Sequence, residues 1–180
     1  VDLETLRLLA MEGVAYTILA PWQVDGGPSL DTRQPVRIEL GDGRSIVAVL
    51  YDAGLSTAAS FDPTATIDAD AFVRERVMPR FASDVDAAPG LVVIATDGEL
   101  YGHHQPLRER FLARLVGRAA PADRPYATPR LADAIAMADA SGLPMASLNE
   151  RTSWSCHHGV TRWTGHCGCV ADGEWKGPLR

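Results

Sequence analysis

The stretch VRIELGDGRSIVAVL, residues 36–50, has the pattern of two short strands joined by a turn. Residues 36–40 alternate apolar and polar side chains, and residues 45–50 are rich in β-branched valine and isoleucine, which favour strands. Between them lies Asp42-Gly43, a favoured pair for a tight turn, because both residues tolerate the positive φ angles that such a turn requires. The stretch predicts a β-hairpin, which we expect to be an insertion that decorates an α/β core.

The segment before this hairpin predicts a helix followed by a strand. Apolar residues recur at helical spacing over residues 2–13, and Gly13 is a typical helix end. Residues 14–20 are nearly continuous in apolar character, as in a short buried strand, and Pro21 ends them. A helix that leads directly into a strand is half of a βαβ unit.

Beyond the hairpin, helices and strands continue to alternate. A helix is predicted over residues 68–83, with a kink or an end near Pro79. The run LVVIA at residues 91–95 is typical of a buried parallel strand. Two further helices are predicted over residues 106–116 and 129–140. The order of these elements indicates an α/β fold.

The composition excludes several classes of protein. The chain has 180 residues, 46% of them hydrophobic, which is enough to bury a core. The formal net charge of -6 argues against a nucleic-acid partner, and the apolar runs are too short to cross a membrane. We expect a soluble, cytoplasmic protein. Because the helical pattern starts at once after Val1, we also expect the chain to be a fragment of a longer protein.

The first group of chemically useful residues is TDGELYGHH, residues 96–104, directly after the strand predicted at 91–95. The carboxyl ends of strands in α/β folds are where sites form. Asp97 and Glu99 are two residues apart, so in an extended chain both would face one cavity, and a glycosidase needs two carboxyl groups. The alternative is that Asp97-Gly98 is simply a turn.

His103 and His104 have two interpretations. Together with Asp97 they could bind a metal ion, as in metal-dependent deacetylases. Neighbouring side chains point apart, however, so binding of sugar hydroxyl groups or orientation of the acid is favoured over a shared ion.

The second group lies near the end of the chain, in a segment rich in glycine, tryptophan, cysteine and histidine. Three thiols and an imidazole form a Cys₃His set, which suits four-coordinate zinc; they belong to Cys156, His158, Cys167 and Cys169. The alternative is a set of reduced cysteines in a cramped turn. Trp154 and Trp163 bracket the first three ligands or pack in a core, and their flat faces can also stack on sugar rings.

Three stretches of the chain resemble glycoside hydrolase family 57. Residues 95–104 resemble the acid/base motif of that family, Asp-Gly-Glu-x-aromatic-Gly. Residues 152–163 are similar to a later motif with Ser-Trp, a glycine and a second tryptophan, and residues 1–23 are similar to the segment that follows the nucleophile motif. The cysteine cluster resembles a less characterised branch, in which a domain of unknown function follows the glycosidase-like region.

The resemblance implies an enzyme that retains the anomeric configuration of α-glucans, either a hydrolase or a transferase of the amylase and branching-enzyme kind. Its fold would be a (β/α)₇ barrel, and catalysis would need no cofactor. Residues 1–145 would form part of this barrel with the hairpin insertion near 36–50. Residues 146–180 would be an irregular segment leading into a following domain, with a structural zinc at the cysteine cluster.

Residue roles follow from the same resemblance. Asp97 would be the general acid and base, and the glutamate nucleophile would lie just upstream of Val1, so the chain alone is expected to be inactive. An oligo- or polysaccharide substrate would contact Glu99, His103, His104, Trp22, Trp154 and Trp163. Relatives often carry histidine at the position of Trp22. Two alternatives stay open: a metal-dependent carbohydrate deacetylase-like hydrolase, and a non-catalytic relative that binds glucan.

Overall fold

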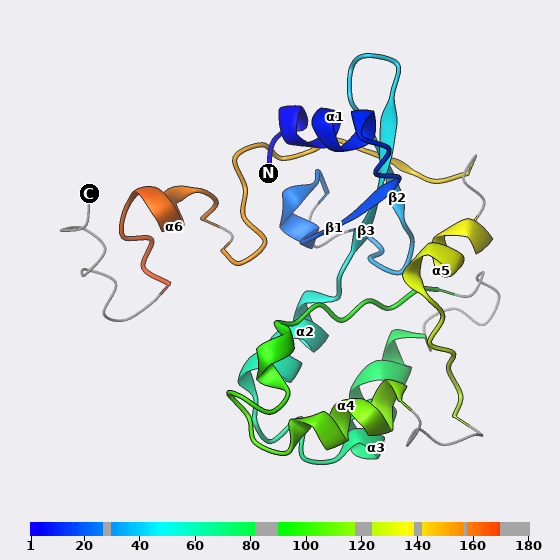
Figure 1. Cartoon of the computed structure of the whole chain (residues 1–180), viewed down its shortest axis with the longest axis vertical. Helices are drawn as coiled ribbons and strands as arrows, with labels where there is room; N and C mark the ends of the chain where they lie inside the picture. The colour runs from blue at the N-terminus through cyan, green and yellow to red at the C-terminus, as the bar shows by residue number, and fades with distance from the viewer. Residues whose placement is uncertain (27–29, 82–89, 118–123, 139–141, 157, 170–180) are drawn as a thin grey trace. The chain divides into compact units, whose positions relative to one another are not determined.

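The computed structural model describes residues 1–26, 30–81, 90–117, 124–138, 142–156 and 158–169 (Figure 1). The chain forms two compact units. The sheet unit comprises residues 1–31, 35–50 and 143–180, and the helical unit comprises residues 32–34 and 51–142. The expectation that residues 146–180 lead into a following domain stays a prediction.

A four-stranded mixed sheet is the centre of the sheet unit. Its strands, in spatial order, are β1 (Tyr16–Leu19), β3 (Ser45–Leu50), β2 (Val36–Glu39) and β4 (Met145–Ala146). β3 runs parallel to β1 and antiparallel to β2, while β2 and β4 are parallel. Strands from both ends of the chain therefore meet in one sheet.

The predicted hairpin is confirmed, but its place in the fold is not. β2 and β3 pair from Val36↔Ala48 to Glu39↔Ser45, and Gly43 in the turn has a φ of 79°. The expectation of a decorating insertion is wrong, because the hairpin supplies the two inner strands of the sheet. The (β/α)₇ barrel is also wrong for this chain. A barrel of that kind needs parallel neighbours, whereas the central pair here is antiparallel.

The strand predicted at residues 91–95 does not form. This segment is half-buried and makes single hydrogen bonds to separate partners, including the amide of Asp52, which donates to the Val93 carbonyl at 2.8 Å. Val92 and Ile94 pack against a cluster of helical side chains. The apolar pattern thus reflects packing on helices rather than pairing in a sheet.

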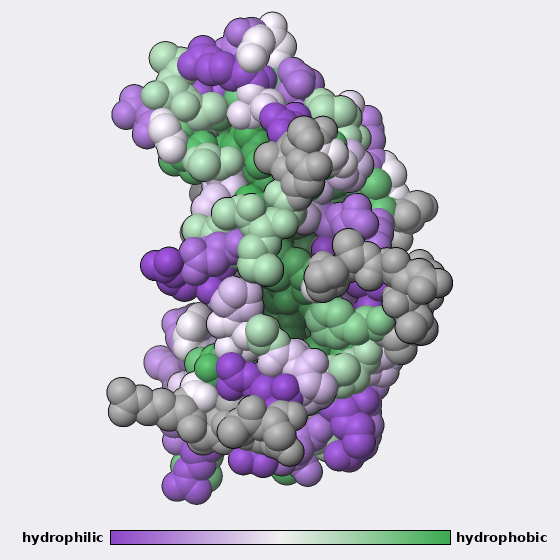
Figure 2. Space-filling view, turned by 90° about the vertical axis from the view of Figure 1, so that its right-hand side faces the viewer, coloured by the Kyte–Doolittle hydropathy of each residue, from purple (hydrophilic) through white to green (hydrophobic). Residues whose placement is uncertain are grey.

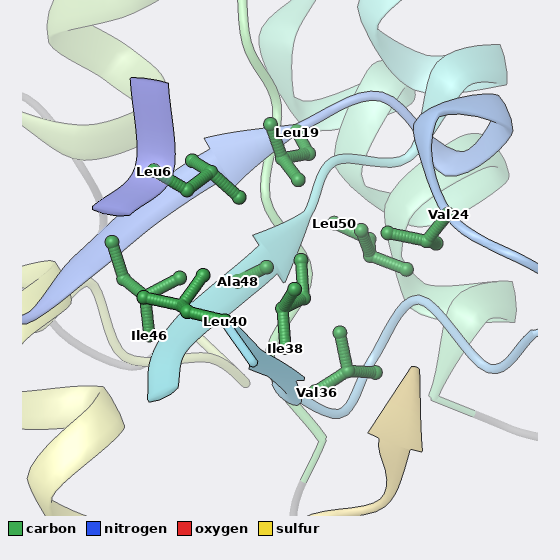
Figure 3. Packing of buried hydrophobic residues seen from close by; sticks show 9 residues of the cluster. All are labelled: Leu6, Leu19, Val24, Val36, Ile38, Leu40, Ile46, Ala48 and Leu50. Carbon is green, nitrogen blue, oxygen red and sulfur yellow. The ribbon is translucent and has the colours of Figure 1, made fainter. Parts of the chain in front are cut away.

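One helix covers the sheet. In α1 (Leu3–Met11), the side chain of Asp2 accepts the Thr5 amide at 2.8 Å and caps the first turn. Leu6 from this helix joins alternate residues of β2 and β3 in a buried core, as expected when one face of each strand is covered. Figure 3 shows how these side chains gather around the strands: Leu6, Leu19, Val24, Val36, Ile38, Leu40, Ile46, Ala48 and Leu50.

The helical unit has its own core. Its described elements are α2 (Ala53–Phe61), α3 (Ala69–Phe72), η3 (Val73–Val77), η4 (Met78–Arg80), η5 (Gly98–Leu100), α4 (Arg108–Val116) and α5 (Leu131–Met137). The edge of one aromatic ring meets the face of another between Phe72 and Phe111, with centroids 5.3 Å apart. The helix predicted over 68–83 loses its regular α-helical bonding after Phe72 and continues through η3 and η4, near Pro79.

None of the helices in the described ranges combines the length and the apolar character that crossing a bilayer requires. On the face drawn in Figure 2, hydrophilic residues recur among hydrophobic ones.

Candidate functional site

A closed loop over residues 151–160 builds the first half of the candidate site. The amide of Val160 donates to the carbonyl of Arg151 at 3.1 Å and closes the loop. Inside it, the amide of Cys156 donates to the Ser153 carbonyl at 3.5 Å, and the amide of Gly159 donates to the Cys156 carbonyl at 3.0 Å. These turns fix the backbone that carries Cys156.

Gly159 is required where the loop closes on itself. Its φ is 65°, in the left-handed region that favours glycine. A Cβ atom at this position would lie 2.6 Å from the carbonyl oxygen of Arg151, which is too close for any side chain. Arg151 itself has a φ of 59°. Two left-handed residues therefore bring the ends of the loop together.

The second half of the site follows α6 (Thr161–Thr164), which separates Cys156 and His158 from Cys167 and Cys169. Gly168, with a φ of 74°, turns the chain between the last two cysteines. The structure thus brings together all four residues that the sequence pattern predicts as metal ligands.

The four ligand atoms lie within 4.8 Å of one another. The Sγ atom of Cys156 is 3.4 Å from that of Cys169 and 3.9 Å from that of Cys167. The Nδ1 atom of His158 is 3.1 Å from Cys169 Sγ and 3.6 Å from Cys156 Sγ. In a tetrahedral site with zinc–ligand bonds of about 2.0–2.3 Å, the ligand atoms lie roughly 3.3–3.8 Å apart. The printed distances bracket this range.

The electrostatics of the cluster disfavour a second negative charge. Hydrogen bonding with the thiol of Cys156, and then with that of Cys167, raises the pKa of the Cys169 thiol to about 11. A bound divalent cation reverses this preference, because it stabilises thiolates directly. Cys156 is buried, Cys167 is half-buried, and Cys169 and His158 are exposed. The cluster can hold a metal ion, and among the described residues it is the only group of three or more potential ligands.

Trp22 lies against the loop that carries Cys156. Its Nε1 atom donates to the Ser153 carbonyl at 2.9 Å, and its own carbonyl accepts from Asn149 Nδ2 at 3.1 Å. Trp154 and Trp163 are both 58% exposed. Sugar stacking by the three tryptophans stays a prediction, but the indole N–H of Trp22 is already used inside the protein.

Asp97 lies at the start of η5, at the end of the extended segment 90–96. Its side chain is exposed, and no described residue forms a hydrogen bond or ion pair with its carboxylate. Residues 98–100 form a 3₁₀ turn, so the alternation expected of an extended chain does not apply to Asp97 and Glu99. The hydroxyl groups of Thr96 and Tyr101, 2.9 Å apart, join the two sides of this turn.

The two adjacent histidines make different contacts. The Nε2 atom of His104 is 3.2 Å from a carboxylate oxygen of Glu99, and both side chains are exposed. The ring of His103 meets that of His104 edge to face, with centroids 4.7 Å apart. Asp97 does not join these histidines in any described group of three potential ligands. Their assigned roles in substrate binding stay predictions.

A buried network supports this motif, and the sequence pattern did not reveal it. Thr66 is almost fully buried; its hydroxyl donates to Gln105 Oε1 at 3.1 Å and accepts from Arg108 Nε at 2.7 Å. The Nε2 atom of Gln105 donates to the carbonyl of Ser60 at 3.0 Å. These bonds attach the end of the motif to residues some forty positions earlier, a pairing for which the sequence contains no local signal.

Comparison of the chain with protein family models, with curated proteins and with solved structures finds no match. What the protein does must therefore be inferred from its own residues.

Proposed function

We propose that this chain is part of a carbohydrate-active enzyme that acts on α-glucans with retention of configuration at the anomeric carbon. The observation that carries the proposal is Asp97: an exposed carboxylate, free of described partners, within the motif that resembles a glycosidase acid/base segment. Exposure makes this group accessible to a polysaccharide, which is too large to enter a closed cavity.

In the proposed reaction, Asp97 donates a proton to the glycosidic oxygen as the bond to the leaving sugar breaks. After a glycosyl-enzyme has formed, the same residue accepts a proton from water or from an acceptor sugar hydroxyl. A second carboxylate must act as the nucleophile. Glu99 is poorly suited to that role because its carboxylate contacts His104. We therefore assign the nucleophile to a residue of the complete protein outside residues 1–180.

Substitution of Asp97 tests this proposal in the complete protein. Asp97→Asn removes the proton donor, so we expect glucan cleavage or transfer to fall by roughly 10²–10⁴-fold, the usual contribution of a general acid or base. Glucan binding should remain. Glu99→Gln is the matched control, and its effect should be far smaller. Unchanged turnover in Asp97→Asn would refute the assignment.

We also propose that the Cys/His cluster is a structural zinc site, with Cys156, His158, Cys167 and Cys169 as its four ligands. Four protein ligands leave no open position for a substrate, which is the arrangement of structural rather than catalytic zinc. The supporting observation is the spacing of the ligand atoms, all within 4.8 Å.

Metal analysis of the purified protein tests the zinc proposal. We expect one zinc ion per chain, with loss of zinc in Cys169→Ser and normal zinc content in His103→Ala. The second variant also tests the deacetylase alternative, which needs a metal ion at Asp97 and the adjacent histidines. Zinc retained in Cys169→Ser but lost in His103→Ala would favour that alternative.

A further inference from the structure

The segment that leads into the metal ligands is bound to two distant parts of the sheet unit. The amino group of Val1 donates to the Thr152 carbonyl at 2.7 Å. Gln23 Nε2 donates to the Thr152 hydroxyl at 3.2 Å, and the Gln23 carbonyl accepts the Asn149 amide at 2.8 Å. Residues 149–153 therefore lie against residues 20–25, which we call the Trp22 corner.

The Trp22 corner is itself firmly built. It contains η1 (Pro21–Gln23), which follows the carboxyl end of β1. The side-chain oxygen of Gln23 accepts the amide of Ala20 at 2.9 Å, and Gln23 is buried. At its far end, the amide of Asp25 donates to the Ser147 carbonyl at 2.9 Å. The corner also forms one side of a cavity of about 310 Å³, lined by Asp25, Gly26, Glu39, Met145, Ala146 and Ser147.

One carbonyl group connects this corner to the metal ligands. The Ser153 carbonyl accepts both the indole N–H of Trp22, at 2.9 Å, and the amide of Cys156, at 3.5 Å. Ser153 is 3% exposed and Cys156 is 2% exposed, so neither group can turn to solvent without breaking the turn. A change in the position of Cys156 therefore moves an acceptor on which Trp22 depends.

We propose that metal binding at the Cys/His cluster controls the Trp22 corner through the Ser153 carbonyl. The bound ion fixes Cys156, the Cys156 turn fixes the carbonyl, and the carbonyl fixes the indole ring and the cavity wall beside it. This inference rests on the proposed zinc site and adds a regulatory role to it. The zinc then acts as a brace for the carboxyl end of β1, where sites form in many α/β proteins.

Thermodynamic linkage makes the coupling measurable from both ends. If zinc strengthens the bond from Trp22 to Ser153, removing that bond must weaken zinc binding by the same factor. A typical intramolecular hydrogen bond has a net effect that corresponds to roughly a twofold to tenfold change in an equilibrium constant. Trp22→Phe keeps an aromatic ring but removes the donor, so its zinc affinity should fall by that factor.

Two measurements on the 180-residue chain test the inference, with Zn²⁺ as the probe. The first is competition between the protein and a chromophoric chelator, comparing Trp22→Phe with the exposed matched control Trp163→Phe. We expect weaker zinc binding only in Trp22→Phe. The second uses a variant whose sole tryptophan is Trp22, made by changing Trp154, Trp163 and Trp175 to phenylalanine. Its fluorescence should shift on zinc addition and saturate at one equivalent.

The outcomes separate the coupling from the zinc site itself. One bound zinc with no fluorescence response from Trp22, and unchanged affinity in Trp22→Phe, would overturn the coupling but leave the zinc site standing. Absence of zinc binding to the unmodified chain would overturn both. Adding Cys169→Ser to the single-tryptophan variant should abolish the fluorescence response, and a response that survives this change would show that zinc acts elsewhere.

Discussion

At the scale of single residues, the metal loop depends on a glycine more than on any side chain that surrounds it. Gly159→Ala places a Cβ atom against the Arg151 carbonyl in a left-handed conformation, so we expect a loss of about 1–3 kcal/mol in the stability of the loop. Zinc affinity should fall with it, measured by chelator competition. Gly165→Ala is the control: nothing lies within 4 Å of its Cβ position, and its φ of -169° suits any residue. Equal effects of the two changes would contradict this account.

Tyr51 gives the molecule a dependence on alkaline pH. Burial raises the pKa of this phenol to about 12. In the unfolded chain it titrates near its usual value of about 10, so the unfolded state loses its proton first as the pH rises. Stability is therefore fully present below about pH 10 and declines above it. Tyr51→Phe should flatten this decline in denaturant titrations at pH 9 to 11, and an unaltered decline would assign it to other groups.

Sequence reasoning succeeded for the metal residues and was limited elsewhere. Cys156, His158, Cys167 and Cys169 lie close together in the chain, so local spacing was enough to group them. The bond from Trp22 to Ser153 spans 131 positions and leaves no trace in any local pattern. The expected shared face of Asp97 and Glu99 assumed an extended backbone, which the η5 turn replaces.

At the scale of elements, α1 is attached to the sheet by one face. Leu6 is 1% exposed and Leu8 is 53% exposed, although both lie in the same helix. We expect Leu6→Ala to lower the free energy of unfolding by about 2–5 kcal/mol, because it leaves a cavity in the core. Leu8→Ala should change it little. Thermal or chemical unfolding of the two variants measures the difference, and similar losses would mean that α1 does not pack as described.

The elements differ in how well sequence patterns reveal them. The Asp-Gly turn, the helix at 108–116 and the first helix follow strong local preferences and were predicted within a few residues. The run at 91–95 misled, because a buried strand and an extended segment packed on helices share one apolar pattern. No element was predicted for α2, whose Ala, Gly, Ser and Thr residues give weak periodicity; the capping Asp52 was the available signal.

At the scale of the whole molecule, the metal ligands and the Trp22 corner belong to the sheet unit alone. Removal of zinc by a chelator should therefore raise amide hydrogen exchange in residues 20–25 and 147–156. Exchange in α3 and α4 should stay unchanged, because their core contains none of these residues. Mass spectrometry of peptides from both units measures the difference. A uniform rise across the chain would mean that the metal supports both units.

The arrangement of the whole molecule was beyond prediction from local patterns. Strand order depends on which edges pair, and β2 finds β4 more than a hundred residues further along the chain. The same hydrophobic runs suit a parallel barrel and a mixed sheet, since both bury them. Only the antiparallel register of β2 with β3, and the parallel register of β3 with β1, distinguish the two architectures.

The interrupted sheet unit also has a consequence for biosynthesis. Residues 51–142 leave the ribosome before residues 143–156 have been translated, so the helical unit has all of its own chain while the sheet still lacks β4 and every cysteine. Domains generally fold as units during synthesis. The nascent β1, β2 and β3 must therefore wait, with one edge unpaired, until the last part of the chain arrives to complete the sheet and the metal loop.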